Sequence, residues 1–368
     1  MDYRDTPNAF LEALCYLGAR VNGFGETALE DRLRSKGVED TSAFRERYAP
    51  FAAVLKKMDA EVPELGPEDA ALFRDLPGFQ YNTSGAFSPA FLLLFPVAPA
   101  YDGDLDRLLS LAAGRTPEDL ARDLLLALDL WDNTAEASAN TTEFFLNTVL
   151  AMTVPAESRL ALLDAQRNGP RLIARAGQLL RPVIHAIRRQ SSRLQALSQT
   201  FGRELEATGC ETYLREITSL NVRKGAAYHI YPLILSPSTN LFLDRPQKDG
   251  SVVIYCGVLR KFLLHAVSDT QDSVAQLSDA FHLLADRTRL EILLYLRDHP
   301  AYGQELADQF GLARNTIHHH MSKLYNAGLV TCTVDGPRVY YALDLEHLRR
   351  LVERQCSLFF RNESEKPR

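Results

Sequence analysis

The segment that most constrains the fold of this chain is residues 302–330, whose pattern predicts two short helices joined by a tight turn. In the second helix, Ile317, Met321 and Leu324 are spaced by four and then three positions. That spacing places all three side chains on one face of a helix with about 3.6 residues per turn. The second helix is therefore expected to pack through this face against the rest of its domain.

Glycines are expected to end both helices. Gly311 and Gly328 each follow the last helical residue, where glycine adopts a left-handed backbone without steric cost. Leu306 and Phe310 provide the buried side of the first helix, and Leu312 lies in the turn between the helices. Together these residues predict a helix-turn-helix.

A β-hairpin is expected directly after the second helix. Residues 329–343 form two β-prone arms around Asp335 and Gly336, and an Asp-Gly pair between such arms is a strong local signal for a hairpin. Pro337 lacks an amide hydrogen, which is tolerated at the exit of a turn or at a sheet edge. The segment therefore predicts a winged helix-turn-helix, in which the hairpin is the wing.

The outward face of the second helix carries side chains suited to nucleic acid. Arg314 and Asn315 are the candidates for base readout, because Arg suits guanine O6 and N7 and Asn suits adenine N6 and N7 in the major groove. Thr316, His319 and Lys323 are candidates for phosphate or shape contacts, which position a protein without reading sequence.

Two further residues complete this candidate surface. His318 lies on the same helix, and Arg338 sits beside the tip of the wing, within reach of the minor groove or a phosphate. An ordinary solvated surface explains any one of these side chains equally well. The prediction therefore depends on the whole set, which is Arg314, Asn315, Thr316, His318, His319, Lys323 and Arg338.

Residues 274–351 resemble the DNA-binding domain of the ArsR (arsenic-repressor-like) family of bacterial transcription regulators. Residues 281–296 contain the Ala-Asp-x-Thr-Arg-Leu motif of the family's leading helix pair, residues 316–330 end in Ala-Gly-Leu-Val like its recognition helix, and residues 335–343 are similar to its wing. These pieces cover about a fifth of the chain, in the family's order and spacing. The resemblance implies binding to double-stranded DNA and regulation of transcription, usually by repression.

The helix before the helix-turn-helix has its own signals. Asp286 is expected to cap a helix that begins at Arg287, because an aspartate at this position accepts hydrogen bonds from the first free amides. Four apolar side chains are predicted to form its buried face: Leu290, Ile292, Leu293 and Leu296.

A last amphipathic helix is expected at residues 344–360. Its apolar side is formed by Leu345, Leu348, Leu351, Val352 and Leu358. In the family a helix of this kind pairs across a two-fold axis, so the resemblance implies a homodimer. A dimer presents two recognition helices about one DNA turn apart, which predicts an inverted-repeat operator.

The charge of the chain is unusual for a nucleic-acid binder. Its formal net charge is −6, and residues 270–368 carry 12 Lys and Arg against 13 Asp and Glu. Residues 309–334, however, contain no acidic residue. The positive field is therefore local, and we expect DNA binding that weakens with salt but with a modest slope.

No metal site and no cofactor is predicted. His318, His319 and His320 are consecutive, and successive helical side chains point about 100° apart, so these imidazoles cannot converge on one ion. His320 is expected to face the seam between helices beside Met321. The five cysteines are far apart and form no C-x-x-C pattern, which argues against a disulfide framework or a zinc knuckle.

Other classes of protein are also disfavoured. The chain has no signal peptide and no apolar run of the length that spans a bilayer, so a cytoplasmic location is expected. It contains no Gly-rich phosphate loop, no His-Glu-x-x-His and no Gly-x-Ser-x-Gly, so no enzymatic activity is expected.

The expected fold class is mainly α with small β elements. Helix starts are predicted after residue 6 and at five later Pro-containing pairs, because proline suits the first turn of a helix. These pairs are Gly66-Pro67, Ser88-Pro89, Thr116-Pro117, Val154-Pro155 and Gly169-Pro170, and the first start is Thr6-Pro7. Residues 171–205 predict one or two long helices, which Pro182 bends or divides.

The composition becomes rich in β-prone residues at 228–258. This segment predicts a small antiparallel sheet of two or three strands. The expected organisation is an N-terminal, mainly helical regulatory or dimerisation domain at 1–267 and a linker at 268–273. The winged helix-turn-helix domain follows at 274–361, and a disordered tail at 362–368 ends the chain.

The role of the N-terminal domain stays open between a sensor of a ligand or partner, a structural extension of the dimer, and an enzyme fused to a regulator. A polar stretch at residues 131–143 either lines a pocket or caps connected helices, and we favour capping. The predicted function is a sequence-specific, DNA-binding transcriptional regulator with an effector of unknown identity. The alternative is a protein-interaction module that uses the winged fold without reading DNA sequence.

Overall fold

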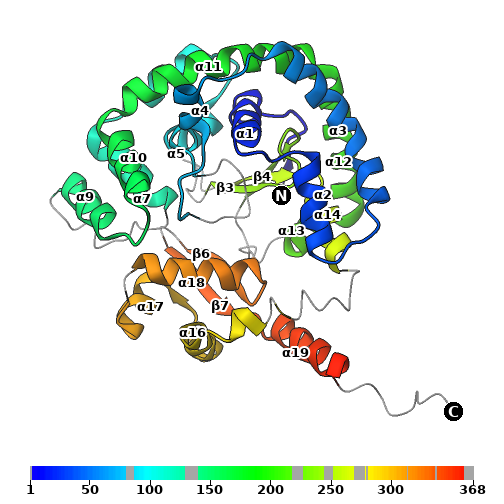
Figure 1. The fold of residues 1–368 in the computed structure, drawn as a ribbon, viewed down its shortest axis with the longest axis vertical. Coiled ribbons are helices and arrows are strands. Elements are labelled where there is room, and N and C mark those ends of the chain that lie inside the picture. Colours follow the sequence, from blue (N-terminus) through cyan, green and yellow to red (C-terminus); the bar gives the residue numbers. More distant parts are fainter. Residues whose placement is uncertain are drawn as a thin grey trace. The chain divides into compact units, whose positions relative to one another are not determined.

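The computed structural model describes residues 2–79, 87–128, 140–217, 227–243, 252–268, 278, 281–312, 314–335 and 338–359. The chain forms two compact units (Figure 1). The first contains Met1–Glu30, Ser42–Tyr213 and Gly225–Lys261, and the second contains Asp31–Thr41, Leu214–Lys224 and Phe262–Arg368. The predicted fold class, mainly α with small β elements, is confirmed.

The domain boundaries at 267 and 274 stay a prediction. Residues 269–273 of the predicted linker and the whole predicted tail lie outside the described residues. Most of the polar stretch at 131–143 also lies outside them, but Asn140 is described, and its side chain accepts the Glu143 amide at 3.0 Å as the N-cap of the next helix.

The helices of the first unit are bounded as follows, and α2, α13 and α14 each continue into the second unit. They are α1 (Ala9–Val21), α2 (Glu26–Ser35), α3 (Ser42–Glu61), α4 (Pro67–Phe73), α5 (Pro89–Leu94), the 3₁₀ helix η1 (Phe95–Ala100), α6 (Leu105–Ala113), α7 (Pro117–Ala127), α9 (Thr141–Ala151), α10 (Ala156–Arg167), α11 (Gly169–Arg189), α12 (Ser191–Thr208), α13 (Cys210–Ile217) and α14 (Arg260–Ser268).

Proline marks the helix starts, largely as predicted. Helices α4, α5 and α7 begin at their prolines, Pro155 precedes α10, and α11 begins at Gly169. The predicted first start was wrong, because α1 begins at Ala9 rather than after Thr6. Asn8 is the N-cap, since its side chain accepts the Leu11 amide at 3.0 Å and also donates to the Ala98 carbonyl at 2.9 Å.

Helix α11 is the longest helix of the described residues and packs against α1, α5, α6, α10 and α12 (Figure 1). It runs through Pro182, and the long helical region divides at Gln190, so the two predicted long helices form but Pro182 does not divide them. Leu180, Val183 and Ile184 are buried on either side of the proline, and this packing holds the helix together across the hydrogen bond that proline cannot make.

Arginines on the outer side of α11 pair with three other helices. Arg175 reaches Asp69 on α4 with two contacts of 2.7 Å, and Arg181 reaches Asp106 on α6 at 2.6 Å. Arg189 reaches Glu61 on α3 at 2.7 Å. These exposed pairs add little stability each, but they fix the orientation of α11.

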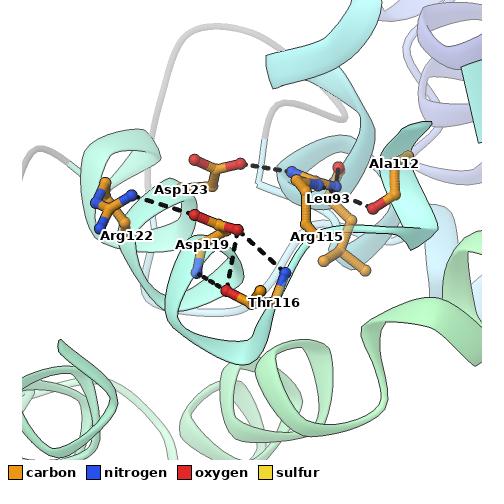
Figure 2. Close-up of polar contacts among 7 residues, drawn as sticks. All are labelled: Leu93, Ala112, Arg115, Thr116, Asp119, Arg122 and Asp123. Carbon is orange, nitrogen blue, oxygen red and sulfur yellow. Dashed lines mark hydrogen bonds and ion pairs between the residues drawn. The ribbon is translucent and has the colours of Figure 1, made fainter. Parts of the chain in front are cut away.

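A buried arginine joins α5, α6 and α7 (Figure 2). Arg115 donates from Nη1 to Asp123 of α7 at 2.6 Å, from Nε to the Ala112 carbonyl at 2.9 Å, and from Nη2 to the Leu93 carbonyl. In the next turn, Thr116 and Asp119 exchange side-chain and backbone hydrogen bonds as a capping box. The end of α6 and the start of α7 are thus held as one corner.

The first unit contains a four-stranded mixed sheet in the order β1-β2-β4-β3. Its strands are β1 (Asp2–Tyr3), β2 (Tyr228–Leu233), β3 (Asn240–Leu243) and β4 (Val252–Gly257). β1 and β4 pair with β2 in parallel, and β3 pairs with β4 antiparallel. The prediction of an antiparallel sheet of two or three strands was therefore wrong.

The physical reason is that β4 inserts between β2 and β3, so these two strands are consecutive in the sequence but not adjacent in the sheet. A buried bend at residues 234–239 makes this order possible, because it carries the chain from β2 past the edge of β4. Gly257 allows the close approach, since a Cβ there would lie 2.5 Å from the Pro237 carbonyl oxygen.

The central helix α1 is buried on all sides from Phe10 to Ala19, including Glu12. The Glu12 carboxylate accepts the amides of Ile234 and Leu235 at 2.7 and 2.8 Å, and so anchors the bend after β2. Burial is the main reason why the pKa of Glu12 is raised to about 7, and the two amide hydrogen bonds oppose that rise.

The second unit contains α16 (Arg287–Asp298), β5 (Ala301–Tyr302), α17 (Gly303–Phe310), α18 (Arg314–Asn326), β6 (Val330–Asp335), β7 (Arg338–Leu343) and α19 (Leu345–Phe359). Its sheet has the order β5-β7-β6. Among the described residues of the chain, no helix combines the length and the apolar character needed to cross a membrane.

Candidate nucleic-acid interface

The helix-turn-helix forms at the predicted residues. Helix α17 ends at Gly311, whose φ is 62°, and α18 is followed by Gly328, whose φ is 70°. After each helix an amide reaches back to close the turn: Leu312 donates to the Ala307 carbonyl at 3.0 Å and Leu329 to the Leu324 carbonyl at 2.9 Å. Both ends therefore use the left-handed glycine that the sequence predicts.

The predicted face of α18 is buried. Ile317, Met321 and Leu324 pack with Leu306 of α17 in one apolar core, and Phe310 and Leu312 pack against it in part. This core leaves the opposite side of α18 to solvent. The predicted packing of the recognition helix through its apolar face is thus confirmed.

The wing is a hairpin with one additional strand. β6 and β7 pair antiparallel, with Asp335 opposite Arg338. β5 was not predicted; it pairs Tyr302 with Tyr340 of β7, and their rings meet edge to face with centroids 5.5 Å apart. Gly336 and Pro337 lie outside the described residues.

The leading helix corrects one prediction. Asp286 is the N-cap of α16, as predicted, and its Oδ1 accepts the Arg289 amide at 2.9 Å. Ile292, Leu293 and Leu296 are buried, but Leu290 is 41% exposed, so its assignment to the buried face was wrong.

Arg289 takes the place that Leu290 was expected to fill. Positions 289, 292, 293 and 296 form the inward stripe of α16, and Arg289 is only 7% exposed. Its guanidinium donates to the carbonyl oxygens of Leu283 and His282 at 2.6 and 2.8 Å. The spacing of Arg289 from Ile292 and Leu293 was the sequence signal for its burial. It was missed because a charged residue is not expected on a buried face.

The structure brings three of the predicted interface residues to one face of α18. Thr316, His319 and Lys323 are at positions i, i+3 and i+7, and His319 and Lys323 are exposed. Helix α18 itself begins at Arg314. The side chains of Arg314, Asn315, His318 and Arg338 lie outside the described residues.

His320 points inward, as predicted, with its side chain 12% exposed. Its Nδ1 lies 3.8 Å from Oδ1 of Asp286, the cap of α16. Burial, the largest effect, lowers the pKa of His320; Arg289 and Lys323 add to this and Asp286 opposes it. The imidazole is therefore uncharged at neutral pH.

The end of α18 also meets α19. A Cβ added to Gly328 would lie 3.1 Å from Cε1 of His347, so the imidazole lies directly over the glycine. His347 is held by the Asp344 side chain, which accepts its amide at 2.8 Å. Within the parts of the chain that the structure describes, no cluster of three His, Cys, Asp or Glu side chains has the arrangement of a metal site.

Comparison with known proteins gives matches in the C-terminal part of the chain. A family model described as a helix-turn-helix domain matches residues 284–333. The HTH-type transcriptional regulator KmtR of Mycobacterium tuberculosis is 38% identical over 81 residues, which are 22% of this chain and 62% of KmtR. No solved structure gives a significant match.

Two further relatives have the same character. The HTH-type transcriptional regulator CmtR of Mycobacterium bovis is 44% identical over 69 residues, 19% of this chain and 58% of CmtR. The chain thus spans about three fifths of the length of KmtR and CmtR. The arsenical resistance operon repressor of Staphylococcus aureus is 35% identical over 81 residues, 22% of this chain and 78% of the repressor.

The region matched by the family model covers α16, α17, α18 and the first part of β6, and these elements together with β7 have the geometry of a winged helix-turn-helix. Through its C-terminal part, the chain belongs to the ArsR family of helix-turn-helix transcriptional regulators.

Proposed function

We propose that this chain is a transcriptional regulator that binds double-stranded DNA through α17, α18 and the β6–β7 wing. The observation that carries the proposal is the division of α18 into a buried apolar face and an outward face with Thr316, His319 and Lys323. No acidic residue occurs from 309 to 334, so this face does not repel phosphates. Membership of the family supports the same function.

Sequence would be read by the first turn of α18. Arg314 and Asn315 are the proposed base-reading residues, because recognition helices present their N-terminal residues to base edges in the major groove. The remaining residues are proposed to contact phosphates or the minor groove: Thr316, His318, His319, Lys323 and Arg338.

The proposed active form is a homodimer. Apolar side chains of α16 and α19 are open to solvent, since Leu294 is 59%, Leu345 57% and Val352 44% exposed. Such groups favour burial against a second copy of the chain. A two-fold dimer would bind an inverted-repeat operator.

The first unit is the proposed sensor. We infer that a small molecule or a protein partner, acting on this unit, changes the spacing of the two recognition helices and thereby the affinity for DNA. The name of the arsenical resistance operon repressor supports repression as the outcome. The proposed site of action is the bacterial cytoplasm, where the DNA lies.

The test is selection of duplexes from a random-sequence library by the purified full-length protein, followed by sequencing. We expect one inverted repeat to be enriched. The double variant Arg314→Ala, Asn315→Ala should bind all duplexes similarly. Each base contact that it loses is worth about 1–3 kcal/mol of discrimination against the wrong base. Arg297→Ala, which removes an exposed arginine paired with Asp298 outside the recognition helix, should select the same repeat.

A double variant that still enriches the wild-type repeat contradicts the assignment of base readout. If the wild-type protein enriches no sequence, the regulatory proposal fails, and the protein-interaction role becomes the better account of the winged fold.

A further inference from the structure

A network of polar contacts runs through the interior of the helix-turn-helix, from the turn before α16 to α18. Arg289 holds the carbonyls of His282 and Leu283, and its Nη1 lies 3.4 Å from Oδ2 of Asp286. Asp286 in turn caps α16 and faces His320. One carboxylate therefore contacts the start of α16 and the middle of the recognition helix.

The side chains of Asp286 and His320 face each other but do not form a hydrogen bond. The 3.8 Å between Oδ1 and Nδ1 exceeds a hydrogen bond, and Nδ1 has no hydrogen-bond partner among the residues that the structure describes. A buried polar atom without a partner costs about 1–3 kcal/mol. A second state of the domain that closes the contact would recover this free energy.

Protonation of His320 would allow this hydrogen bond to form. The imidazolium donates from both nitrogens, and a charge-assisted hydrogen bond to a carboxylate has a length of about 2.7–2.9 Å, so a movement of about 1 Å suffices. In the free protein, burial, Arg289 and Lys323 disfavour the charged form, and only Asp286 favours it.

DNA changes that balance. Phosphates beside α18 add negative charge near His320 and neutralise the field of Lys323, so they favour uptake of a proton. The proton would come from solvent, and no covalent bond changes.

We propose that Asp286 and His320 are positioning residues for DNA binding: they form an ion pair when the phosphates of a bound duplex draw a proton onto His320. The pair fastens the recognition helix to the capped start of α16 while α18 occupies the groove. This inference rests on the proposed function. Because binding takes up a proton, the affinity for DNA increases as the pH falls.

The test measures the affinity of the full-length protein for the fluorescein-labelled duplex enriched by the selection above, by anisotropy between about pH 6 and pH 8. For wild type we expect an increase of up to about tenfold per pH unit for each proton taken up. His320→Asn should bind within about threefold of wild type at the upper pH and lose most of the slope.

Two further variants separate the pair from its surroundings. Asp286→Asn keeps an N-cap of equal quality but removes the charge, so it too should lose most of the slope. His299→Asn removes an exposed imidazole at the end of α16, outside the proposed DNA-binding face, and should retain most of it. A slope that survives in His320→Asn, or that is lost in His299→Asn instead, overturns the inference.

A second measurement is the pKa of His320 in ¹⁵N-histidine-labelled wild type, titrated by NMR with and without the duplex. A variant is needed only to assign the His320 signal. The pKa of His320 should rise when the duplex is added, and an unchanged pKa overturns the inference. A wild type that binds the duplex with a flat pH profile refutes only this inference. A wild type that enriches no duplex refutes the proposed function and this inference together.

Discussion

Gly328 is required at the end of the recognition helix for two independent reasons. Its φ of 70° is strained for any residue with a Cβ, and the His347 ring occupies the space that a Cβ would enter. Gly311 has a similar φ of 62° but open space around it. A comparison of substitutions at the two positions therefore separates the cost of backbone strain from the cost of steric contact.

We therefore expect Gly328→Ala to lower the free energy of unfolding by about 2–3 kcal/mol, against about 1 kcal/mol for the control Gly311→Ala. Urea denaturation of both variants gives the comparison. Equal losses would show that the His347 ring moves aside without cost.

Glu12 makes the stability of the first unit depend on pH. The carboxylate has a raised pKa of about 7 in the folded protein, against an ordinary value of 4.5. The folded state therefore holds the proton more tightly than the unfolded state, and this stabilisation is complete below about pH 4.5 and lost as the pH rises through about 7.

The expected loss between those two values is on the order of 1–3 kcal/mol. Chemical denaturation of wild type and Glu12→Gln at several pH values isolates it, because the other titrating groups are common to both. The pH dependence should be smaller in Glu12→Gln, and parallel curves would contradict the prediction.

Single residues also show where sequence reasoning ends. Asp286, Gly311 and Gly328 were predictable, because a cap or a left-handed turn depends on local chemistry alone. Arg289 was not, because a buried guanidinium depends on two carbonyl groups that another segment supplies. The hydrogen bonding of Glu12 likewise depends on a bend 222 positions away, whose amides its carboxylate accepts.

At the scale of elements, the corner between α6 and α7 depends on one buried ion pair. The Arg115 and Asp123 side chains are 11% and 8% exposed, whereas those of Arg181 and Asp106 are 47% and 73% exposed. Removal of one partner leaves an uncompensated charge only in the buried pair.

Asp123→Ala should therefore lower the free energy of unfolding by about 3–5 kcal/mol, while Asp106→Ala should change it little, because solvent screens the exposed pair. Thermal unfolding followed by circular dichroism measures both. A loss in Asp106→Ala as large as that in Asp123→Ala would mean that burial does not govern these pairs.

The helices and the first sheet differ in how far sequence predicts them. Proline positions located the starts of α4, α5 and α7, because the effect of proline on the backbone is local. The order β1-β2-β4-β3 escaped prediction, because it depends on which strand β4 pairs with rather than on any pattern within a strand.

At the scale of the whole molecule, the proposed dimer depends on the exposed apolar residues of α16 and α19. Leu345→Glu places a charge among them, so we expect the variant to sediment as a monomer at micromolar concentration and to bind the selected duplex at least about tenfold more weakly. Leu160→Glu is the control, because Leu160 is 65% exposed on α10 in the first unit. If both variants remain dimers, α19 is not the interface.

The two units also differ in what their sequences reveal. The second unit carries a family pattern in which local signals specify most of the fold, and its interface residues were proposed from that pattern. In the first unit, the polar side chains named above serve as caps and ion pairs, and several of their partners come from distant segments. Its proposed ligand or partner is therefore a question for experiment.

The parallel pairing of β1 with β2 has a consequence for how the protein is made. Asp2 and Tyr3 lie beside His229 and Ile230, so the edge of the sheet cannot close on the ribosome until the strands near residue 230 have emerged. The helices between them form early because their contacts are local, but Glu12 must wait for the bend that it anchors. The first unit therefore cannot be complete until its last strand, β4, which ends at Gly257, has emerged.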